Sequence, residues 1–199
     1  MIQDYFDWDV QLFLYFNNLG NEKWDWFWLL ITDKKTWIPL YVVFLILLYV
    51  KLGWKKTLLA GVCIALMIAG ADQFTNVMKD SFQRFRPCYT ESIQGLFRPI
   101  DCEGRGKFGF TSAHASNHIA IAIFMGVLLR RQYKWLIYVL VFWALMIAYS
   151  RVYVGVHFTG DIFFGTLIGI FFAYIFLKLY YFLEKKFNSI GFDTINIYD

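Results

Sequence analysis

Long runs of apolar residues, separated by short polar segments, dominate this chain. A helix that crosses a lipid bilayer needs about 20 mostly apolar residues. Three segments come close to that length with few charges, over residues 58–77, 135–149 and 162–182. A fourth covers residues 110–129, and a shorter fifth covers residues 37–50. The pattern therefore predicts an all-α, polytopic membrane helix bundle with five spans.

The N-terminal region, residues 1–35, has a different pattern. Residues 5–19 mix aromatic with acidic residues and end at the helix-stopping residues Asn17, Asn18 and Gly20. Residues 22–31 are aromatic but short for a span. Because Trp and Tyr favour the headgroup level of a membrane, we expect two helices that lie in the interface or re-enter it. A sixth span built from part of this region is the alternative.

The composition is typical of a membrane protein. The chain has 199 residues, of which 59% are hydrophobic and 17% are charged, and it contains 22 Phe, 13 Tyr and 8 Trp. An average globular domain is about a quarter charged and under half apolar. Disorder is excluded by this apolar content, and three cysteines are too few for a disulfide-dense mini-protein. We expect one integral-membrane domain over residues 1–199, no cleavable signal peptide and no nucleic-acid partner.

Basic residues between the predicted spans indicate the orientation. Three clusters fall on one side if five spans alternate, and the positive-inside rule places that side in the cytoplasm. The clusters are Lys51, Lys55 and Lys56; Arg130, Arg131 and Lys134; and Lys178, Lys185 and Lys186. A polar tail over residues 187–199 follows there. Residues 79–110, residues 150–158 and the N-terminal region then lie on the extracytoplasmic side.

The extracytoplasmic loop over residues 79–110 is also basic, against the positive-inside rule. Its cations are Lys79, Arg84, Arg86, Arg98, Arg105 and Lys107. Basic residues on the extracytoplasmic side, where the rule disfavours them, indicate a function such as anion binding. In an oxidising compartment, Cys88 and Cys102 can form a disulfide, which would contribute about 3 kcal/mol by closing a loop of about 15 residues. Two separate thiols are the alternative.

Three extracytoplasmic segments hold the polar residues that hydrocarbon excludes, and such residues indicate function. In the first segment, Lys79 and Arg86 are seven residues apart, so on one helix they share a face and can clamp a dianion. Pro87 predicts that this helix ends near Arg86. Two solvated loop charges are the alternative.

The second segment begins the fourth span. Thr111 or Ser112 is suited to cap that helix, and backbone amides at a helix start form an anion site. His114 beside the amides can give or take a proton. A capping pair with an interfacial histidine is the alternative.

The third segment pairs His157 with Asp161, four residues or one helical turn apart at the start of the last span. A carboxylate there can accept the ring N–H, which fixes the tautomer and leaves the other nitrogen as a nucleophile. Arg151 lies in the same segment. A buried hydrogen-bonded pair is the alternative, but an Asp at this depth is costly without a purpose.

Together these residues suit phosphoryl transfer, which needs cations for the equatorial oxygens, a nucleophile in line and an acid for the leaving oxygen. Lys79, Arg86 and Arg151 supply the positive charge, and the chain has no carboxylate-rich cluster typical of magnesium sites. We therefore expect no metal and no cofactor. A proton-coupled transporter is the non-enzyme alternative, although relay residues belong near the midplane and these lie at span ends.

The three segments resemble the signature motifs of the type 2 phosphatidic acid phosphatase superfamily, which includes membrane lipid phosphatases. The first motif, Lys, six residues, Arg-Pro, is matched by Lys79, Arg86 and Pro87. The second, Pro-Ser-Gly-His, is matched only by Ser112 and His114, with Thr111 and Ala113 in the other places. The third, Ser-Arg, five residues, His, three residues, Asp, is matched by Ser150, Arg151, His157 and Asp161. The resemblance covers about residues 58–182.

The resemblance implies a role for each matched residue. His157 attacks phosphorus and becomes phosphohistidine, while Asp161 orients it. His114 protonates the leaving oxygen and then activates water. The phosphoryl oxygens are held by Lys79, Arg86, Ser112, Arg151 and the amide of Ala113. His118, one turn beyond His114, lies outside the motif and is expected to line the site; support of His114 is the alternative.

A site between apolar helices suits an amphiphile whose headgroup enters the basic pocket. We expect a lipid phosphate or pyrophosphate, first of all undecaprenyl pyrophosphate, which the short bacterial-looking form of the family suggests. Lipid A is the runner-up, with Arg98, Arg105 and Lys107 available for a multi-anionic headgroup, and phosphatidylglycerophosphate or phosphatidic acid is a further alternative. The expected location is a bacterial inner membrane, with the site facing the periplasm. The oligomeric state is left open.

Overall fold

The computed structural model describes residues 7–189, and over that range the chain is a bundle of six α-helices. They are α1 (Asp7–Asn18), α2 (Glu22–Thr32), α3 (Ile38–Phe82), α4 (Ala113–Leu128), α5 (Leu136–Tyr153) and α6 (Thr159–Ser189). Short 3₁₀ helices lie in the connections, namely η2 (Lys34–Trp37), η3 (Pro87–Tyr89) and η4 (Glu91–Ile93). The all-α prediction is confirmed. Most of the predicted tail over residues 187–199, and residues 1–6 of the N-terminal region, lie outside the described residues.

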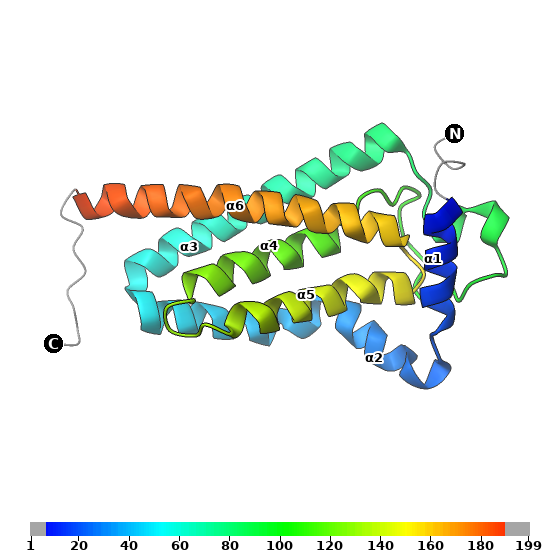
Figure 1. Cartoon of the computed structure of the whole chain (residues 1–199), viewed down its shortest axis with the longest axis horizontal. Coiled ribbons are helices and arrows are strands. Elements are labelled where there is room, and N and C mark those ends of the chain that lie inside the picture. Colours follow the sequence, from blue (N-terminus) through cyan, green and yellow to red (C-terminus); the bar gives the residue numbers. More distant parts are fainter. Residues whose placement is uncertain (1–6, 190–199) are drawn as a thin grey trace.

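Helix α3 reverses direction at Gly53. This residue has φ 78° and ψ 165°, a backbone conformation that glycine adopts without a Cβ clash. The two limbs, residues 38–52 and 54–82, run in opposite directions along the bundle (Figure 1). The two segments that the sequence separates, residues 37–50 and 58–77, are therefore these limbs.

Three stretches of helix are long and apolar enough to cross a membrane. They are Lys34–Phe82, which contains both limbs of α3, Leu136–Tyr153 and Thr159–Phe187. Helix α4 is apolar but shorter, and it lies in the middle of the bundle against α3, α5 and α6 (Figure 1). Most of its residues are buried, so the polar groups at its start are enclosed by the other helices.

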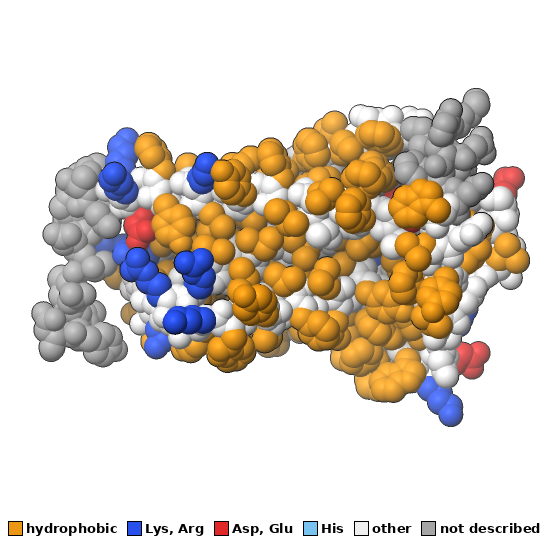
Figure 2. Space-filling model, in the orientation of Figure 1, with side chains coloured by type: hydrophobic (Ala, Val, Ile, Leu, Met, Phe, Trp, Pro, Cys, Tyr) orange, Lys and Arg blue, Asp and Glu red, His pale blue; other side chains and the backbone are white. Residues whose placement is uncertain are grey.

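The surface divides into an apolar middle and two unlike ends. Apolar side chains such as Trp54, Phe142 and Phe163 are exposed on α3, α5 and α6. Figure 2 shows most of the visible Lys and Arg side chains gathered where α3 bends and α6 ends. The three basic clusters thus share one end of the molecule, because each follows or precedes a helix end there. The connection over residues 83–112 and the α5–α6 turn lie at the other end (Figure 1).

The two N-terminal helices lie at this second end. Helix α1 runs across the ends of α5 and α6 (Figure 1), and its Phe13 packs against Phe97 and Phe158 at centroid distances of 5.4 and 5.2 Å. Helix α2 packs on α5, where Trp28 stacks on Tyr153 at 5.1 Å. The prediction of two short helices is confirmed, and neither is among the candidate spans.

Candidate active site

The three polar segments meet at the end of the bundle that carries α1. The Ser112 N–H, at the start of α4, donates to the backbone oxygen of Asp161 in α6 at 3.1 Å. The side chain of Arg86 donates to the backbone oxygen of Val156, in the α5–α6 turn, at 3.1 Å. The ends of α3, α4, α5 and α6 are thereby joined around one buried polar centre.

His157 and Asp161 form a buried pair at this centre. The Asp161 Oδ2 atom accepts from His157 Nδ1 at 3.2 Å and from the Phe158 N–H at 3.0 Å. Because Nδ1 faces a carboxylate, it carries the ring proton, and Nε2 presents its lone pair toward Arg86 Nη1 at 3.0 Å. His157 lies in the turn before α6, so the expectation that both residues sit on that helix is wrong for His157. The Asp161 carboxylate still reaches the His157 ring, because Asp161 lies in the first turn of α6 and its side chain bonds back to the Phe158 N–H next to His157.

The environment keeps His157 neutral. Burial holds the pKa of its imidazole well below the usual value, and the positive charges of Arg86, Arg151 and Lys79 lower this pKa further. Cations from α3, from the connection after it and from α5 therefore act on one ring. A neutral imidazole with an unprotonated Nε2 is a competent nucleophile.

Lys79 and Arg86 do not share a helix. Helix α3 ends at Phe82, and Gln83 adopts a left-handed conformation with φ 47° while its N–H bonds to the Lys79 oxygen. Arg86 is extended, and its N–H donates to the backbone oxygen of Lys107 at 2.9 Å. The sequence-based clamp on one helical face is therefore wrong, because the chain leaves the helix before Arg86.

Ser112 is the N-cap of α4. Its Oγ accepts from the Ala115 N–H at 3.5 Å, so of the two candidates it is Ser112, and not Thr111, that caps the helix. Ala113 and His114 form the first turn, where backbone N–H groups are free of intrahelical partners. The amide of Ala113 thus lies at the positive end of the helix dipole.

His118 is held by hydrogen bonds on both ring nitrogens. Its Nδ1 donates to the His114 backbone oxygen at 2.8 Å, and its Nε2 is 3.2 Å from the Tyr41 hydroxyl. The His114 and His118 rings lie 6.0 Å apart. His118 therefore supports the turn that carries His114 and lines a neighbouring cavity.

Arg151 is buried, with 2% of its surface exposed, and its guanidinium donates to the hydroxyl of Thr32 in α2. Asp101 lies 4.0 Å away. Within residues 7–189, the Nε atoms of Arg86 and Arg151 are buried donors with no hydrogen-bond partner. Buried N–H groups of cations beside a neutral imidazole are suited to bind phosphoryl oxygens.

Two loop cations that were expected to serve a multi-anionic headgroup are already paired. Arg98 forms an ion pair with Asp25 of α2 at 2.7 Å, and Arg105 pairs with Asp101, four residues earlier in the same loop. These contacts fasten the loop to the bundle, because they link it to α2 and to itself. The use of Arg98 and Arg105 for a multi-anionic headgroup stays a prediction, and Lys107 is exposed.

The sequence did not indicate that two further charged residues, Arg84 and Asp9, lie behind the His157–Asp161 pair. Arg84 donates to Asp161 Oδ1 at 2.9 Å and to Asp9 Oδ2 at 2.7 Å, and all three side chains are buried. Asp9, in α1, also accepts from the Gly160 N–H at 2.6 Å. Burial raises the pKa of Asp9, and Arg84 opposes this increase. Arg84 was visible as a cation in the first segment, but no spacing connects it to a residue 75 positions earlier.

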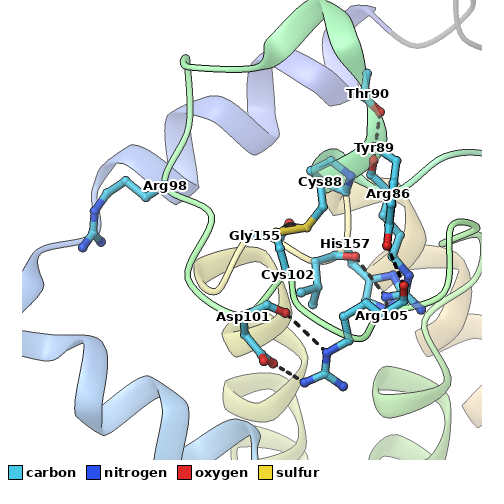
Figure 3. The surroundings of a disulfide bond; sticks show 12 residues. Arg86, Cys88, Tyr89, Thr90, Arg98, Asp101, Cys102, Arg105, Gly155 and His157 are labelled. Atoms are coloured by element: carbon cyan, nitrogen blue, oxygen red, sulfur yellow. Dashed lines mark hydrogen bonds and ion pairs between the residues drawn. A yellow bond between two sulfur atoms is a disulfide. The ribbon is translucent and has the colours of Figure 1, made fainter.

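The Cys88–Cys102 disulfide is present, with the Cα atoms 5.9 Å apart. Figure 3 shows it beside Gly155 and close to Arg86 and His157. The loop that it closes rests on the α5–α6 turn, since the N–H groups of Ile100 and Asp101 both donate to the Val154 oxygen at 3.2 Å. The predicted disulfide is confirmed, and it braces the turn that carries His157. No group of His, Cys, Asp and Glu in residues 7–189 is arranged to hold a metal ion.

Several known proteins are similar to this chain in sequence. Residues 57–185 match the model of the PAP2 superfamily. The chain is 37% identical to the lipid A 4'-phosphatase of Bacteroides thetaiotaomicron, over 95% of this chain and 82% of that protein. It is 31% identical to the lipid A 4'-phosphatase of Porphyromonas gingivalis, over 88% of this chain and 74% of that protein.

Two solved structures are also similar. The crystal structure of LpxE from Aquifex aeolicus has a TM-score of 0.65 and 27% identity, and the match covers 87% of this chain and 96% of that one. A transmembrane PAP2 type phosphatidylglycerolphosphate phosphatase from Bacillus subtilis has a TM-score of 0.67 at 19% identity, covering 96% and 87% of the two chains, which shows a shared fold. The expected family is confirmed by the match over residues 57–185: this chain belongs to the PAP2 superfamily and is a membrane lipid phosphatase.

Proposed function

We propose that this protein is a lipid A 4'-phosphatase. The observation that carries the proposal is the 37% identity to such an enzyme along 95% of this chain, which includes the N-terminal helices as well as the motifs. A fold shared with a phosphatidylglycerolphosphate phosphatase does not discriminate between substrates. The comparisons therefore favour lipid A over undecaprenyl pyrophosphate, the first expectation from the sequence.

In the proposed reaction, His157 Nε2 attacks the phosphorus atom in line with the leaving oxygen. A P–N bond forms, the P–O bond to the sugar breaks, and His114 gives its proton to the leaving oxygen. Asp161 stabilises the positive charge that develops on the imidazole, through the 3.2 Å contact to Nδ1. The neutral state of His157 supports this role, because the ring starts with a free lone pair.

Water then attacks the phosphohistidine. His114 takes a proton from that water, the P–N bond breaks, and inorganic phosphate leaves. Lys79, Arg86, Arg151, Ser112 and the Ala113 amide hold the equatorial oxygens in both steps. The buried, unpartnered Nε atoms of Arg86 and Arg151 in the described chain support this assignment.

We propose five spans, formed by the two limbs of α3 together with α4, α5 and α6. The shared end of the three basic clusters then lies in the cytoplasm, and the site faces the periplasm. Helix α1 lies along the periplasmic interface, and residues 79–110 form the extracytoplasmic loop. The start of α4, with Ser112 as its N-cap, lies at this same end, which supports a site near the periplasmic face.

The test compares three lipids with one purified preparation in detergent. Lipid A, undecaprenyl pyrophosphate and phosphatidic acid are supplied separately, and phosphate release is measured over time. We expect the highest kcat/KM with lipid A, and a product that mass spectrometry shows to lack the phosphate of the non-reducing sugar. His157→Asn protein is the control for background hydrolysis. A preference for undecaprenyl pyrophosphate, or loss of the other phosphate, contradicts the proposal.

A further inference from the structure

A cavity of about 460 Å³ lies between the two limbs of α3 and α4. All of its polar lining is at the end near the candidate active site, and the deeper lining consists of aliphatic and aromatic residues of α3 and α4. The polar lining residues are Lys34, Tyr41, Asp72, Asn117 and His118. The cavity is thus amphipathic along its length, which suits one part of a lipid molecule that carries both a headgroup and an acyl chain.

The polar end continues directly from the phosphate-binding residues. Asp72, Asn76 and Lys79 are spaced by four and three residues on α3, so they share one face of the helix. Lys79 donates to Asn76 Oδ1 at 3.2 Å. On α4, Asn117 lies one turn beyond His114. A molecule whose phosphate reaches Lys79 therefore extends along this face toward Asp72, about 10 Å deeper by helix rise.

Two groups at this end, the Asp72 carboxylate and the Asn117 amide oxygen, are hydrogen-bond acceptors. Asn117 Nδ2 donates to Asp72 Oδ1 at 2.8 Å, so the amide oxygen of Asn117 points elsewhere, and within residues 7–189 it is buried without a partner. None of the ion pairs among those residues includes Asp72. A carboxylate that forms no close ion pair in a membrane span is costly, and hydrogen-bond donors lower that cost.

These acceptors select a class of ligand. A second phosphate offers only acceptors and is repelled by Asp72. Sugar hydroxyl groups and amide N–H groups are donors, and an acylated amino-sugar lipid has both next to its phosphate. Phosphatidic acid and a polyprenyl pyrophosphate have no such donors beside the phosphate.

We propose that Asp72 and Asn117 form a subsite that recognises the sugar of a phosphorylated saccharide lipid, with an acyl chain in the apolar part of the cavity. This inference rests on the proposed function and names the residues that would give it substrate selectivity. Lys34 lies at the same end of the cavity and adds a donor for the headgroup. The subsite is separate from the groups that act on the phosphorus atom.

The experiment measures kcat and KM for lipid A and for phosphatidic acid with Asp72→Asn and Asn117→Leu proteins. We expect kcat/KM for lipid A to fall about tenfold or more in each variant, because a hydrogen bond to a charged group is lost or the acceptor pair is broken. The change should appear in KM. The loss with phosphatidic acid should be much smaller, so the ratio between the two lipids falls.

The matched control is Asp80→Asn, which removes a carboxylate from the residue next to Lys79 on the same helix. Asp80 is exposed and is not part of the cavity lining. We expect this variant to keep the wild-type ratio between the lipids. An equal loss on both lipids in Asp72→Asn, or the same shift in Asp80→Asn, overturns the inference, while a wild-type protein without any preference for lipid A overturns the proposed function and the subsite with it.

Discussion

Arg84 Nη1 lies 2.9 Å from Asp161 Oδ1, the carboxylate oxygen that His157 does not use. Oδ2 accepts from His157, so each oxygen of Asp161 has a charged or ring N–H partner. The same guanidinium reaches Asp9 and packs over the Phe158 ring at 4.3 Å. Asp161 is thereby prevented from rotating, and the orientation of the candidate nucleophile depends on a residue of the first helix.

Replacing Asp9 should therefore slow the reaction without weakening substrate binding. In Asp9→Asn protein, Arg84 loses its ion pair with the Asp9 carboxylate, and we expect kcat to fall about tenfold while KM stays near its wild-type value. Removing one member of a buried ion pair also destabilises a protein by about 3–5 kcal/mol. Steady-state kinetics and thermal unfolding in detergent measure the two effects.

Asp25→Asn is the matched control for Asp9. Asp25 pairs with Arg98 near the surface, where both side chains are about a quarter exposed. Such a pair contributes about 1 kcal/mol or less. If both variants lose the same activity and stability, the contacts from Asp9 through Arg84 to Asp161 and His157 do not explain the losses.

The two histidines should fail at different steps. His157→Asn removes the nucleophile, so neither phosphoenzyme nor product should form. His114→Asn keeps the nucleophile but lacks the acid and base, whose help is typically worth about 10²–10⁴-fold. With a pyrophosphate substrate, whose leaving group needs less help, phosphohistidine should accumulate on His157. Acid-labile radiolabel on the His157→Asn protein, or its absence from the His114→Asn protein, would contradict the roles assigned to the two histidines.

Loss of the disulfide should destabilise the protein and lower activity together. By the chain-entropy model, a closed loop of about 15 residues contributes about 3 kcal/mol to the free energy of unfolding. The double variant Cys88→Ser, Cys102→Ser should unfold at a lower temperature than the wild-type protein. Adding reductant should lower the unfolding temperature of the wild-type protein toward that of the variant. Cys63→Ala is the control, because Cys63 is a free buried thiol. A wild-type protein insensitive to reductant would contradict the prediction.

Substitution by alanine should have opposite effects at Gly160 and at Gly61, which both lie in helices. A Cβ on Gly160 would lie 2.7 Å from Asp9 Oδ2, so Gly160→Ala must displace the carboxylate that holds Arg84. We expect a large loss of kcat. A Cβ on Gly61 would have no atom within 4 Å, and alanine favours a helix over glycine by about 1 kcal/mol, so Gly61→Ala should be neutral or stabilising. Thermal unfolding and activity of the pair give the comparison.

Phosphate release should persist in chelator, because three cations of the chain supply the charge that a metal would bring. Vanadate, which adopts a five-coordinate geometry like that of the transition state, should compete with substrate. The measurement is activity with EDTA, with added magnesium and with vanadate. A strict magnesium requirement would contradict the mechanism.

The sequence by itself determined the features that depend on neighbouring residues. Runs of apolar residues predicted the two limbs of α3 and helices α4, α5 and α6. Ser112 was a candidate cap by residue type alone, and Cys88 and Cys102 were near enough along the chain to suggest their bond. Motif spacing predicted His114, His157 and Asp161 as site residues, because each motif is confined to no more than a dozen residues.

The tertiary structure alone decided how these parts meet. The link from Asp9 through Arg84 to Asp161 joins residues more than 70 positions apart, and only the placement of α1 across the bundle brings them within hydrogen-bond distance. Helix packing also decides the contacts of Thr32 with Arg151 and of Asp72 with Asn117, which are 119 and 45 positions apart in the sequence. Propensity and periodicity act over a few residues, whereas the partner of a buried charge is set by which helix faces are packed together.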